Sequence, residues 1–497
     1  MHVGRGFWAR ASAWGRLSAA GAAIGGLALA ACAAFDDGKR DIPRQPLPAA
    51  FKDADAAQAS AAGGAAGKAP LEMPKPGSAW WKDFHNDEID RLVAAALVNN
   101  HDLKVAVARI AQAEAQAGMA NAAQYPNLAL QGQYTEQAPA GGIATVQPGT
   151  PYENQRLPQI GLQTSYELDL WGKNAYAAQS ALALAQASVH YREAVALTLT
   201  SDVVKTYIDY LAETDRLAVA RRNLDDARKA LAAVRTKMDR GDATIIDVQQ
   251  QETAVANAEA AVPLHRLNRE RAFNKLAALL GTTPSELSLS GHSLADVKQP
   301  AVAPGIPSEL ICRRPDIRRA EARLVAADAD IKVARAKMYP DLSFSLQGGY
   351  GGPAFTNLIV PTNVFYIILG SLTQTIFDAG KVEDEIRFNK ARREEMVESY
   401  RKAILDAVHD VEDALAELRS TGERHTALAN AASHARQAYA VSTTSFDSGN
   451  TDYITLLDTE RSLFTAEDAE TGIRAERLKA SVDLFKALGG GIEPPRC

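Results

Sequence analysis

Four carboxylates in the second half of the chain share the spacing of one helix face. Asp406, Asp410, Asp413 and Glu417 follow the pattern i, i+4, i+7 and i+11, which places them along one side of an α-helix. An apolar stripe lies two residues, or about 200°, away, so the stripe packs while the carboxylates face roughly the other way. Rings of carboxylates around a pore favour cations. The apolar stripe consists of Ile404, Val408, Val411, Leu415 and Leu418.

Catalytic motifs are missing from the sequence. There is no HExxH, GxSxG or Walker motif, and the histidines are scattered. Gly349-Tyr350-Gly351 imitates part of a dinucleotide fingerprint, but Pro353 follows it and no helix begins there. A loop after a strand is the better interpretation. The sequence therefore predicts a protein that is not an enzyme and that holds no metal and no organic cofactor.

Charge and hydrophobicity exclude two further classes of protein. The chain has 54 Lys and Arg against 60 Asp and Glu, a net charge of -6, which argues against nucleic acid as a partner. After the first 32 residues no apolar run reaches about 18 residues, the length that a membrane-spanning helix requires. Helical membrane spans are therefore not expected.

The first residues have the pattern of an export signal that ends at a cysteine. Met1–Arg16 is basic, and Leu17–Ala31 is apolar and rich in small residues. Leu29-Ala30-Ala31-Cys32 resembles the bacterial lipobox, in which the cysteine thiol becomes the attachment point for lipid. We therefore expect residues 1–31 to be a signal peptide and Cys32 to carry a diacylglycerol and an N-acyl chain such as palmitate. An ordinary signal cleaved nearby is the alternative.

Residues 32–80 form a lipidated strap in this interpretation. Ala, Gly, Pro and Asp dominate the segment, and hydrophobic periodicity is missing. Ala33, rather than Asp, follows the cysteine, as in lipoproteins that are sorted to the outer membrane. The three cysteines, at 32, 312 and 497, form neither a disulfide framework nor a CxxC pair. Whether Cys312 pairs with Cys497 stays open.

The rest of the chain is duplicated. His101–Leu128 aligns without a gap with Pro315–Leu342, with eleven identities in 28 positions. The offset is 214 there and 208 further on, where Gly241 meets Gly449 and Glu252 meets Glu460. Each copy has the order helix, Tyr-Pro stop, strand, loop, strand, Gly-Lys, long helix, Gly turn, helix. We therefore expect repeat 1 over 81–280, a linker over 281–309, repeat 2 over 310–488 and a tail over 489–497.

Four segments alternate between apolar and polar residues. They lie at about 127–134, 160–170, 342–350 and 364–377, and the last alternates least. Period-two alternation over about ten residues suits a transmembrane β-strand, with apolar side chains toward lipid and polar ones toward a lumen. A strand of a soluble sandwich alternates in the same way. The export signal and the fourfold recurrence favour the membrane.

Very long helices separate the strand pairs. Lys173–Arg240 contains neither Gly nor Pro and is rich in helix formers. We expect long helices over 173–280 and 381–488, arranged as antiparallel hairpins. A coiled-coil spacer without a conduit is the alternative.

Four strands cannot close a barrel, and open strand edges are not tolerated in lipid. The chain must therefore form oligomers. Two copies give a barrel filled by side chains, whereas three copies leave room for a channel. The predicted fold is thus mainly α with a transmembrane β-barrel contribution: a homotrimer with a twelve-stranded barrel on a long α-helical periplasmic barrel.

The segment Arg313-Arg314-Pro315-Asp316-Ile317 resembles the signature of the outer-membrane factor family, the TolC-like efflux ducts, and particularly its lipoprotein branch. The resemblance covers about residues 80–490, and Cys312 departs from the pattern. Pro315 suits a helix start and Asp316 its first turn, so this motif reads as architectural. Further matching segments are Tyr339-Pro340-Asp341-Leu342, Phe377-Asp378-Ala379-Gly380-Lys381, Gly449-Asn450-Thr451-Asp452-Tyr453 and Leu456-Leu457-Asp458.

The resemblance implies a passive exit duct of a tripartite efflux system for small molecules such as drugs or other toxic compounds. It implies a periplasmic adaptor protein and an inner-membrane RND-type transporter as partners. The protein would lie in the cell outer membrane, anchored by lipid, inserted by its barrel and extending into the periplasm. A non-conducting coiled-coil envelope lipoprotein is the rival, and an export duct for another secretion system is a further alternative.

The carboxylate row is the predicted site of closure of such a duct. Val411-Glu412-Asp413-Ala414-Leu415 resembles the segment beside the constricted entrance of the efflux lipoproteins. If Ser420-Thr421-Gly422 makes the periplasmic turn, Asp413 lies about 10 Å from the tip. A solvated acidic face outside the duct is the alternative. The predicted periplasmic gate consists of Asp406, Asp410 and Asp413, with Arg419 as the nearest basic partner.

Overall fold

A computed structural model gives the fold and describes residues 47–48, 50–51, 79–137, 155–302 and 307–490. All elements below belong to one compact unit, Arg44–Cys497. The predicted signal peptide, Cys32, most of the strap and Cys497 lie outside the described residues. Cys312 is disulfide-bonded.

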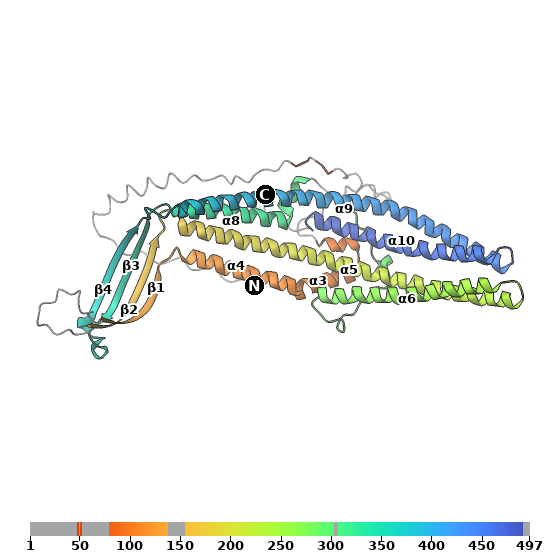
Figure 1. The fold of residues 1–497 in the computed structure, drawn as a ribbon, viewed down its shortest axis with the longest axis horizontal. Helices are drawn as coiled ribbons and strands as arrows, with labels where there is room; N and C mark the ends of the chain where they lie inside the picture. Colours follow the sequence, from red (N-terminus) through yellow and green to blue (C-terminus); the bar gives the residue numbers. More distant parts are fainter. Residues whose placement is uncertain (1–46, 49, 52–78, 138–154, 303–306, 491–497) are drawn as a thin grey trace. The chain divides into compact units, whose positions relative to one another are not determined.

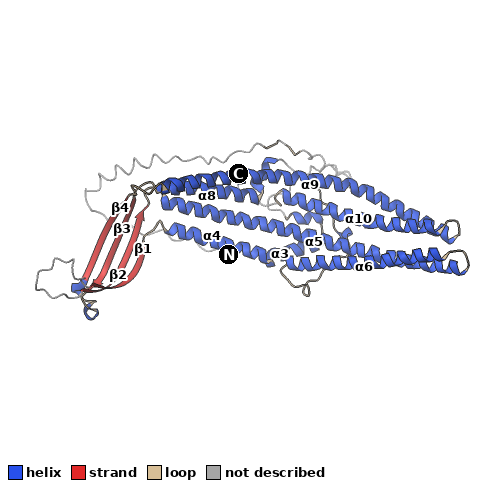
Figure 2. Cartoon of the chain, viewed as in Figure 1, coloured by secondary structure: helices blue, strands red, loops and turns tan. Residues whose placement is uncertain are grey.

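Each repeat contains a helix, two strands and two long antiparallel helices (Figure 1, Figure 2). Short helices precede each repeat: η1 Trp80–Phe84, α3 Asp87–Asn99, η2 Leu294–Asp296, η3 Pro307–Glu309 and α7 Leu310–Arg313. Repeat 1 consists of α4 His101–Ala122, β1 Asn127–Gln137, β2 Gln155–Leu168, α5 Lys173–Asp239 and α6 Ile245–Leu279. Repeat 2 consists of α8 Pro315–Ala336, β3 Asp341–Gly351, β4 Val364–Thr373, α9 Lys381–Asp447 and α10 Tyr453–Ala487, with η4 Phe355–Asn357 and η5 Pro361–Asn363 between its strands.

The helices of the two repeats lie side by side in one layer. Near the sheet α5 packs against α4 and α8, and α8 packs against α9. Further away α5 packs against α6 and α10, and α10 packs against α9. In Figure 1 the sheet lies at one end of this unit, and the α5–α6 and α9–α10 turns lie at the other. None of the helices in the described part of the chain is both long and apolar enough to cross a membrane.

The predicted turn at Ser420-Thr421-Gly422 is wrong, because these residues lie inside a helix of the second repeat. Helix α9 runs through Gly422 without a break and ends at Asp447. A single glycine inside a helix costs only about 1 kcal/mol relative to alanine, which packing on both sides outweighs. Leu418 and Thr421 are buried next to Gly422, and the Thr421 hydroxyl donates to the carbonyl O of Glu417 at 2.7 Å. The turn lies instead at Gly449, in the place that matches Gly241 of repeat 1.

The four strands form one antiparallel sheet in the order β1-β2-β3-β4. The strands lie close to the predicted residues, with three corrections. β2 begins at Gln155 rather than at 160, because its first residues pair with the end of β1, which continues to Gln137. β2 ends at Leu168 rather than at 170, because the N–H of Leu170 bonds back to the carbonyl O of Leu168 in a turn. β4 ends at Thr373 rather than at 377, so Ile376 and Phe377 belong to the connection to α9.

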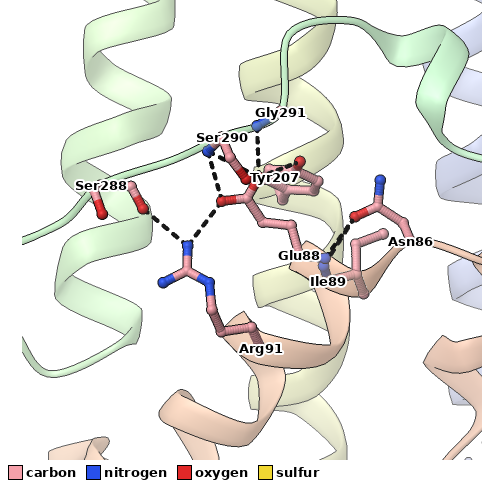
Figure 3. A network of polar contacts seen from close by, with 8 residues as sticks. All are labelled: Asn86, Glu88, Ile89, Arg91, Tyr207, Ser288, Ser290 and Gly291. Atoms are coloured by element: carbon pink, nitrogen blue, oxygen red, sulfur yellow. Dashed lines mark hydrogen bonds and ion pairs between the residues drawn. The ribbon is translucent and has the colours of Figure 1, made fainter.

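A polar network anchors the start of the folded part to α5 (Figure 3). Glu88 of α3 is buried and accepts hydrogen bonds from the N–H groups of Ser290 and Gly291, at 2.9–3.0 Å and 2.6 Å, and from the hydroxyl of Tyr207 at 3.1 Å. Arg91 also donates to Glu88, at 2.8 Å. These bonds hold the pKa of Glu88 below its ordinary value although burial opposes them. The segment after α6 is therefore tied to both α3 and α5.

Candidate functional site

The sheet has one continuous apolar face. The register sets Leu130 opposite Leu162 and Leu346 opposite Ile368, so the apolar alternation of all four strands falls on the same side. These side chains are exposed in the protomer, up to 72% for Leu130 and 77% for Tyr366. An exposed apolar face of this extent needs a nonpolar environment. The other face carries Gln131, Gln163, Ser165, Ser343, Ser345 and Gln347, together with Phe365, Ile367 and Leu369 of β4.

The junction between sheet and helices is built from aromatic and charged side chains. The indole of Trp171 stacks on the ring of Tyr339, with 4.7 Å between centroids. The ammonium of Lys173 pairs with Glu167 at 2.5 Å and with Asp341 at 3.1 Å. Residues of both repeats therefore meet where the strands pass into the helices, which fixes the direction of α5 relative to the sheet.

The predicted gate residues lie in the middle of α9 rather than at its end. Asp413 precedes Asp447, the last residue of the helix, by 34 residues, or about 50 Å at 1.5 Å per residue. The prediction of Asp413 about 10 Å from the tip is therefore wrong, because α9 continues through Gly422 to Asp447. The row itself is exposed and the apolar stripe is largely buried, as the spacing predicts.

The carboxylates of the row have different partners. Asp406 pairs with Lys402 at 2.6 Å and Asp413 with His409 at 3.3 Å, both one turn away on α9. Asp410 instead pairs with Arg314, the residue before α8, at 2.8 Å. Arg419, the basic partner expected from the sequence, is exposed further along α9.

Arg314 joins three helices. Its guanidinium is largely buried and bonds to Asp316 at 2.6 Å, to Asp410 at 2.8 Å and to the carbonyl O of Ala487 at 3.1 Å. These contacts support a structural role for the Arg-Arg-Pro-Asp-Ile motif, and Pro315 is the first residue of α8, as predicted. A cavity of 440 Å³ lies beside it, lined among others by Asp413, Glu417 and Lys486. Partial desolvation beside these helices, together with the nearby Asp483, raises the pKa of Glu417 although its side chain reaches solvent.

The α5–α6 and α9–α10 turns have the same backbone conformation. Gly241 and Gly449 follow α5 and α9 with positive φ angles of 84° and 76°. The N–H of Asp242 bonds to the O of Lys237 at 2.9 Å, and the N–H of Asn450 bonds to the O of Ser445 at 2.8 Å. The Gly449–Tyr453 segment noted in the sequence is therefore the turn of the second hairpin.

Six apolar residues join the two hairpins near these turns and form what we name the tip cluster. They come from all four long helices, so the α5–α6 and α9–α10 hairpins share one small core. Gln251, Lys237 and Glu460 surround it, and the sequence pattern did not identify them as a group. The tip cluster consists of Val234, Val248, Phe446, Tyr453, Leu456 and Leu457.

Three polar contacts cross from one hairpin to the other at the tip cluster. Lys237 donates to the carbonyl O of Phe446 at 2.6 Å and lies 3.5 Å from the centre of its ring. The fully buried Gln251 accepts a hydrogen bond from the hydroxyl of Tyr453 at 2.6 Å. The amide of Gln251 donates to Glu460 at 3.5 Å. Burial, more than the neighbouring Glu460, raises the pKa of Tyr453 to about 12, so its hydroxyl remains a donor at ordinary pH.

Comparison with known proteins agrees with this geometry. Residues 92–282 and 306–490 match the outer membrane efflux protein family. The chain is 36% identical to the pyoverdine export outer membrane protein OpmQ of Pseudomonas aeruginosa, over 84% of this chain and 88% of that protein. It is 29% identical to the probable outer membrane lipoprotein SilC of Salmonella typhimurium, over 83% and 88% of the two chains.

A solved structure extends the agreement to the fold. The outer-membrane channel OprN superposes with a TM-score of 0.80 at 28% identity, over 91% of this chain and 98% of that one. The family is one of transport proteins, which confirms the prediction that the chain is not an enzyme. The chain belongs to the outer membrane efflux protein family, whose members are channels of the outer membrane.

Proposed function

We propose that three copies of the chain assemble into one duct that carries small molecules across the outer membrane. The observation that carries this proposal is that sheet and helix layer share the same two edges. The sheet ends at β1 and β4, and next to it the layer ends at α4 and α9. Open strand edges are unfavourable in lipid, and four strands are too few to enclose a pore. Joining β1 and α4 of one copy to β4 and α9 of the next satisfies both edges at once.

Exposed apolar side chains on the two helical edges support this assembly. Met119 of α4 is 67% exposed and Phe388 of α9 is 65% exposed, and both lie within two to three turns of the sheet. Exposed apolar groups on both edges suit burial against another copy.

Two measurements test the assembly. Light scattering of the detergent-purified chain should give a protein mass close to three protomers. A chain with Met119→Cys and Phe388→Cys should form cross-linked multimers with a bifunctional thiol reagent, whereas each single variant should not. A mass of one or two protomers, or multimers from the single variants alone, would reject the arrangement.

Ion conductance distinguishes the proposed duct from a non-conducting tether. We expect purified trimers to conduct ions in planar bilayers, with larger conductance after the contacts at the tip cluster are weakened. Trimers that never conduct, including variants such as Lys237→Ala that loosen the tip, would favour the tether.

We also propose that Cys32 carries lipid, which lies outside the described residues. The support is the Leu-Ala-Ala-Cys sequence and the similarity to a protein named a probable outer membrane lipoprotein. Cys32→Ser should abolish incorporation of labelled palmitate, while Cys497→Ser should retain it. Labelling that survives Cys32→Ser would reject the lipid site.

The partners follow from the duct. A passive outer-membrane channel supplies no energy for export against a concentration gradient, so we propose an RND-type inner-membrane transporter as the source of energy and a periplasmic adaptor that connects it to the helix tips. Among cargoes, a siderophore is the first to test, because the chain is similar to a pyoverdine export protein. Deleting the gene should lower the iron-chelating activity of the medium, and unchanged activity would exclude this cargo.

A further inference from the structure

Glu460 is a buried carboxyl group with few polar contacts to replace the water that it loses on burial. Its side chain lies on α10 beside the tip cluster, and the residue is 5% exposed. Its one hydrogen bond in the described part of the chain is the 3.5 Å contact with the neutral amide of Gln251, and it takes part in none of the ion pairs found there. A carboxylate buried without a cation is strongly disfavoured relative to its protonated form.

The charged and titratable groups that face Glu460 do not supply that cation. Asp226 of α5 adds negative charge, and α6 offers only the amide of Gln251. Tyr439 of α9 interacts with Glu460 as a neutral phenol. Arg461, its neighbour on α10, acts from an exposed position. Burial is accordingly the largest influence, and it raises the pKa of Glu460.

The position of Glu460 connects its charge to the packing of the hairpins. Gln251 of α6 is held between Glu460 and Tyr453 of α10, while its amide also donates to the carbonyl O of Ala227 on α5. Separation of the two hairpins would expose Glu460 to water, where its ionised form is favourable. The equilibrium between packed and separated hairpins is therefore linked to one proton per protomer.

We infer that Glu460 is a pH-sensitive latch: when protonated it keeps the α9–α10 hairpin packed on the α5–α6 hairpin, and when ionised it favours their separation at the periplasmic end. Separation widens the inner end of the duct, so this inference rests on the proposed function for its physiological effect. The packing itself can be measured without conduction.

The sign of the effect follows from the two states. The pKa of Glu460 is higher in the packed state than in the exposed one. Packing is therefore strongest below the ordinary pKa of glutamate. It weakens as the pH rises from that value through the raised one, and it then stays constant. Within this window the opening equilibrium constant rises at most about tenfold per pH unit.

Repeat 1 provides a matched control at the equivalent position. Glu252 of α6 corresponds to Glu460, but its side chain is 38% exposed and pairs with Arg235 at 2.7 Å. Glu252→Gln removes the same charge from the same place in the fold without removing a buried carboxyl. Tyr453→Phe is a second control, because it loosens the contact between hairpins and leaves the carboxyl in place.

Amide hydrogen exchange of residues 231–248 and 446–457 in the trimer, corrected for the intrinsic effect of pH, tests the latch between about pH 5 and pH 8. In the wild type and Glu252→Gln, protection should fall as pH rises, by up to about tenfold per unit. Glu460→Gln should hold high protection throughout, and Tyr453→Phe should lower protection at every pH with the same slope. A Glu460→Gln variant with the wild-type slope, or a wild type without any slope, would overturn the latch. Neither result would bear on whether the trimer conducts.

Discussion

In each repeat one side chain links the start of the first helix to the end of the last long helix, and we call this link the joint. The charge of that side chain differs between the two copies. In repeat 1 the buried Asn100 donates to the carbonyl O of Leu279, the last residue of α6, at 2.9 Å. In repeat 2 the equivalent Arg314 donates to the carbonyl O of Ala487, the last residue of α10, at 3.1 Å. The same geometry is thus built once with a neutral amide and once with a guanidinium.

The charged joint of repeat 2 requires more hydrogen-bond and charge partners than the neutral joint of repeat 1. Asn100 also caps α4 by accepting the N–H of Leu103 at 3.0 Å, so one side chain satisfies both helix ends. Arg314 has no acceptor, and Asp316 accepts the N–H of Ile317 instead. Asp316 and Asp410 also neutralise the buried guanidinium. Both copies therefore keep the joint, and in the second copy Arg314 also links it to Asp410 of α9.

Replacing the two joint residues should have unequal effects. Arg314→Met removes a buried cation with three partners, and we expect a loss of about 3 kcal/mol, the lower end for a broken buried pair, because both carboxylates are half exposed. Asn100→Ala should lose about 1 kcal/mol, as for an N-cap. Thermal or denaturant unfolding of the purified protein in detergent measures both. Equal losses would show that the added charge pairs contribute nothing to the second joint.

Replacing the glycine that follows the last long helix of each repeat should also have unequal effects on stability. Gly281 and Gly489 have positive φ angles of 67° and 88°, in the left-handed region, where a side chain costs about 1–2 kcal/mol. A Cβ on Gly281 would lie 2.6 Å from the carbonyl O of Asn99, whereas one on Gly489 would lie 3.1 Å from that of Arg313. We expect Gly281→Ala to destabilise by about 2 kcal/mol and Gly489→Ala by about 1 kcal/mol. The reverse order in unfolding measurements would show that the first joint yields more readily.

The sequence predicted the repeated order of elements because its signals are local. Alternating residues, the Tyr-Pro stops and helix-forming runs act within a few residues, so the strands and the starts of the long helices were found close to their observed positions, whereas the end of α9 was not. Contacts between segments far apart in the chain were not visible. Nothing in the pattern around Asp410 indicates that Arg314, 96 residues earlier, is its partner.

The turns at the end of the long helices show the same limit of local sequence patterns. Gly422 and Gly449 are both glycines in helix-forming surroundings, and the difference lies in packing, which the pattern does not report. Glu252 and Glu460 align as equivalent residues, yet Glu252 is partly exposed and paired with Arg235, whereas Glu460 is buried. The duplication could have located the turn: Gly241 ends the first long helix, and its counterpart is Gly449.

Gly422→Ala tests the corrected turn. Gly422 lies inside α9, and a Cβ there would meet no atom within 4 Å. Alanine in an open helical position should stabilise the protein by about 0.5–1 kcal/mol. Gly449, at the observed turn, has a φ of 76°, so replacing it with alanine should instead destabilise the protein. A loss of stability for Gly422→Ala would restore the turn at that residue.

The smallest expected effect concerns the carboxylate row in the middle of α9, which we propose lines the duct there instead of its tip. Asp413 is exposed and pairs only weakly, one turn away, with His409 at 3.3 Å, so Asp413→Ala should leave stability unchanged. If the row faces the lumen, the permeability of cations relative to anions should fall by less than about twofold, the scale of one screened surface charge. Asp410→Ala should lower cation preference to a similar degree and also destabilise the protein, because Arg314 would lose a partner. Reversal potentials across a salt gradient in planar bilayers measure the selectivity. Unchanged selectivity in both variants, alongside the loss of stability in Asp410→Ala, would assign the row to the outside of the duct and leave Asp410 with a purely structural role.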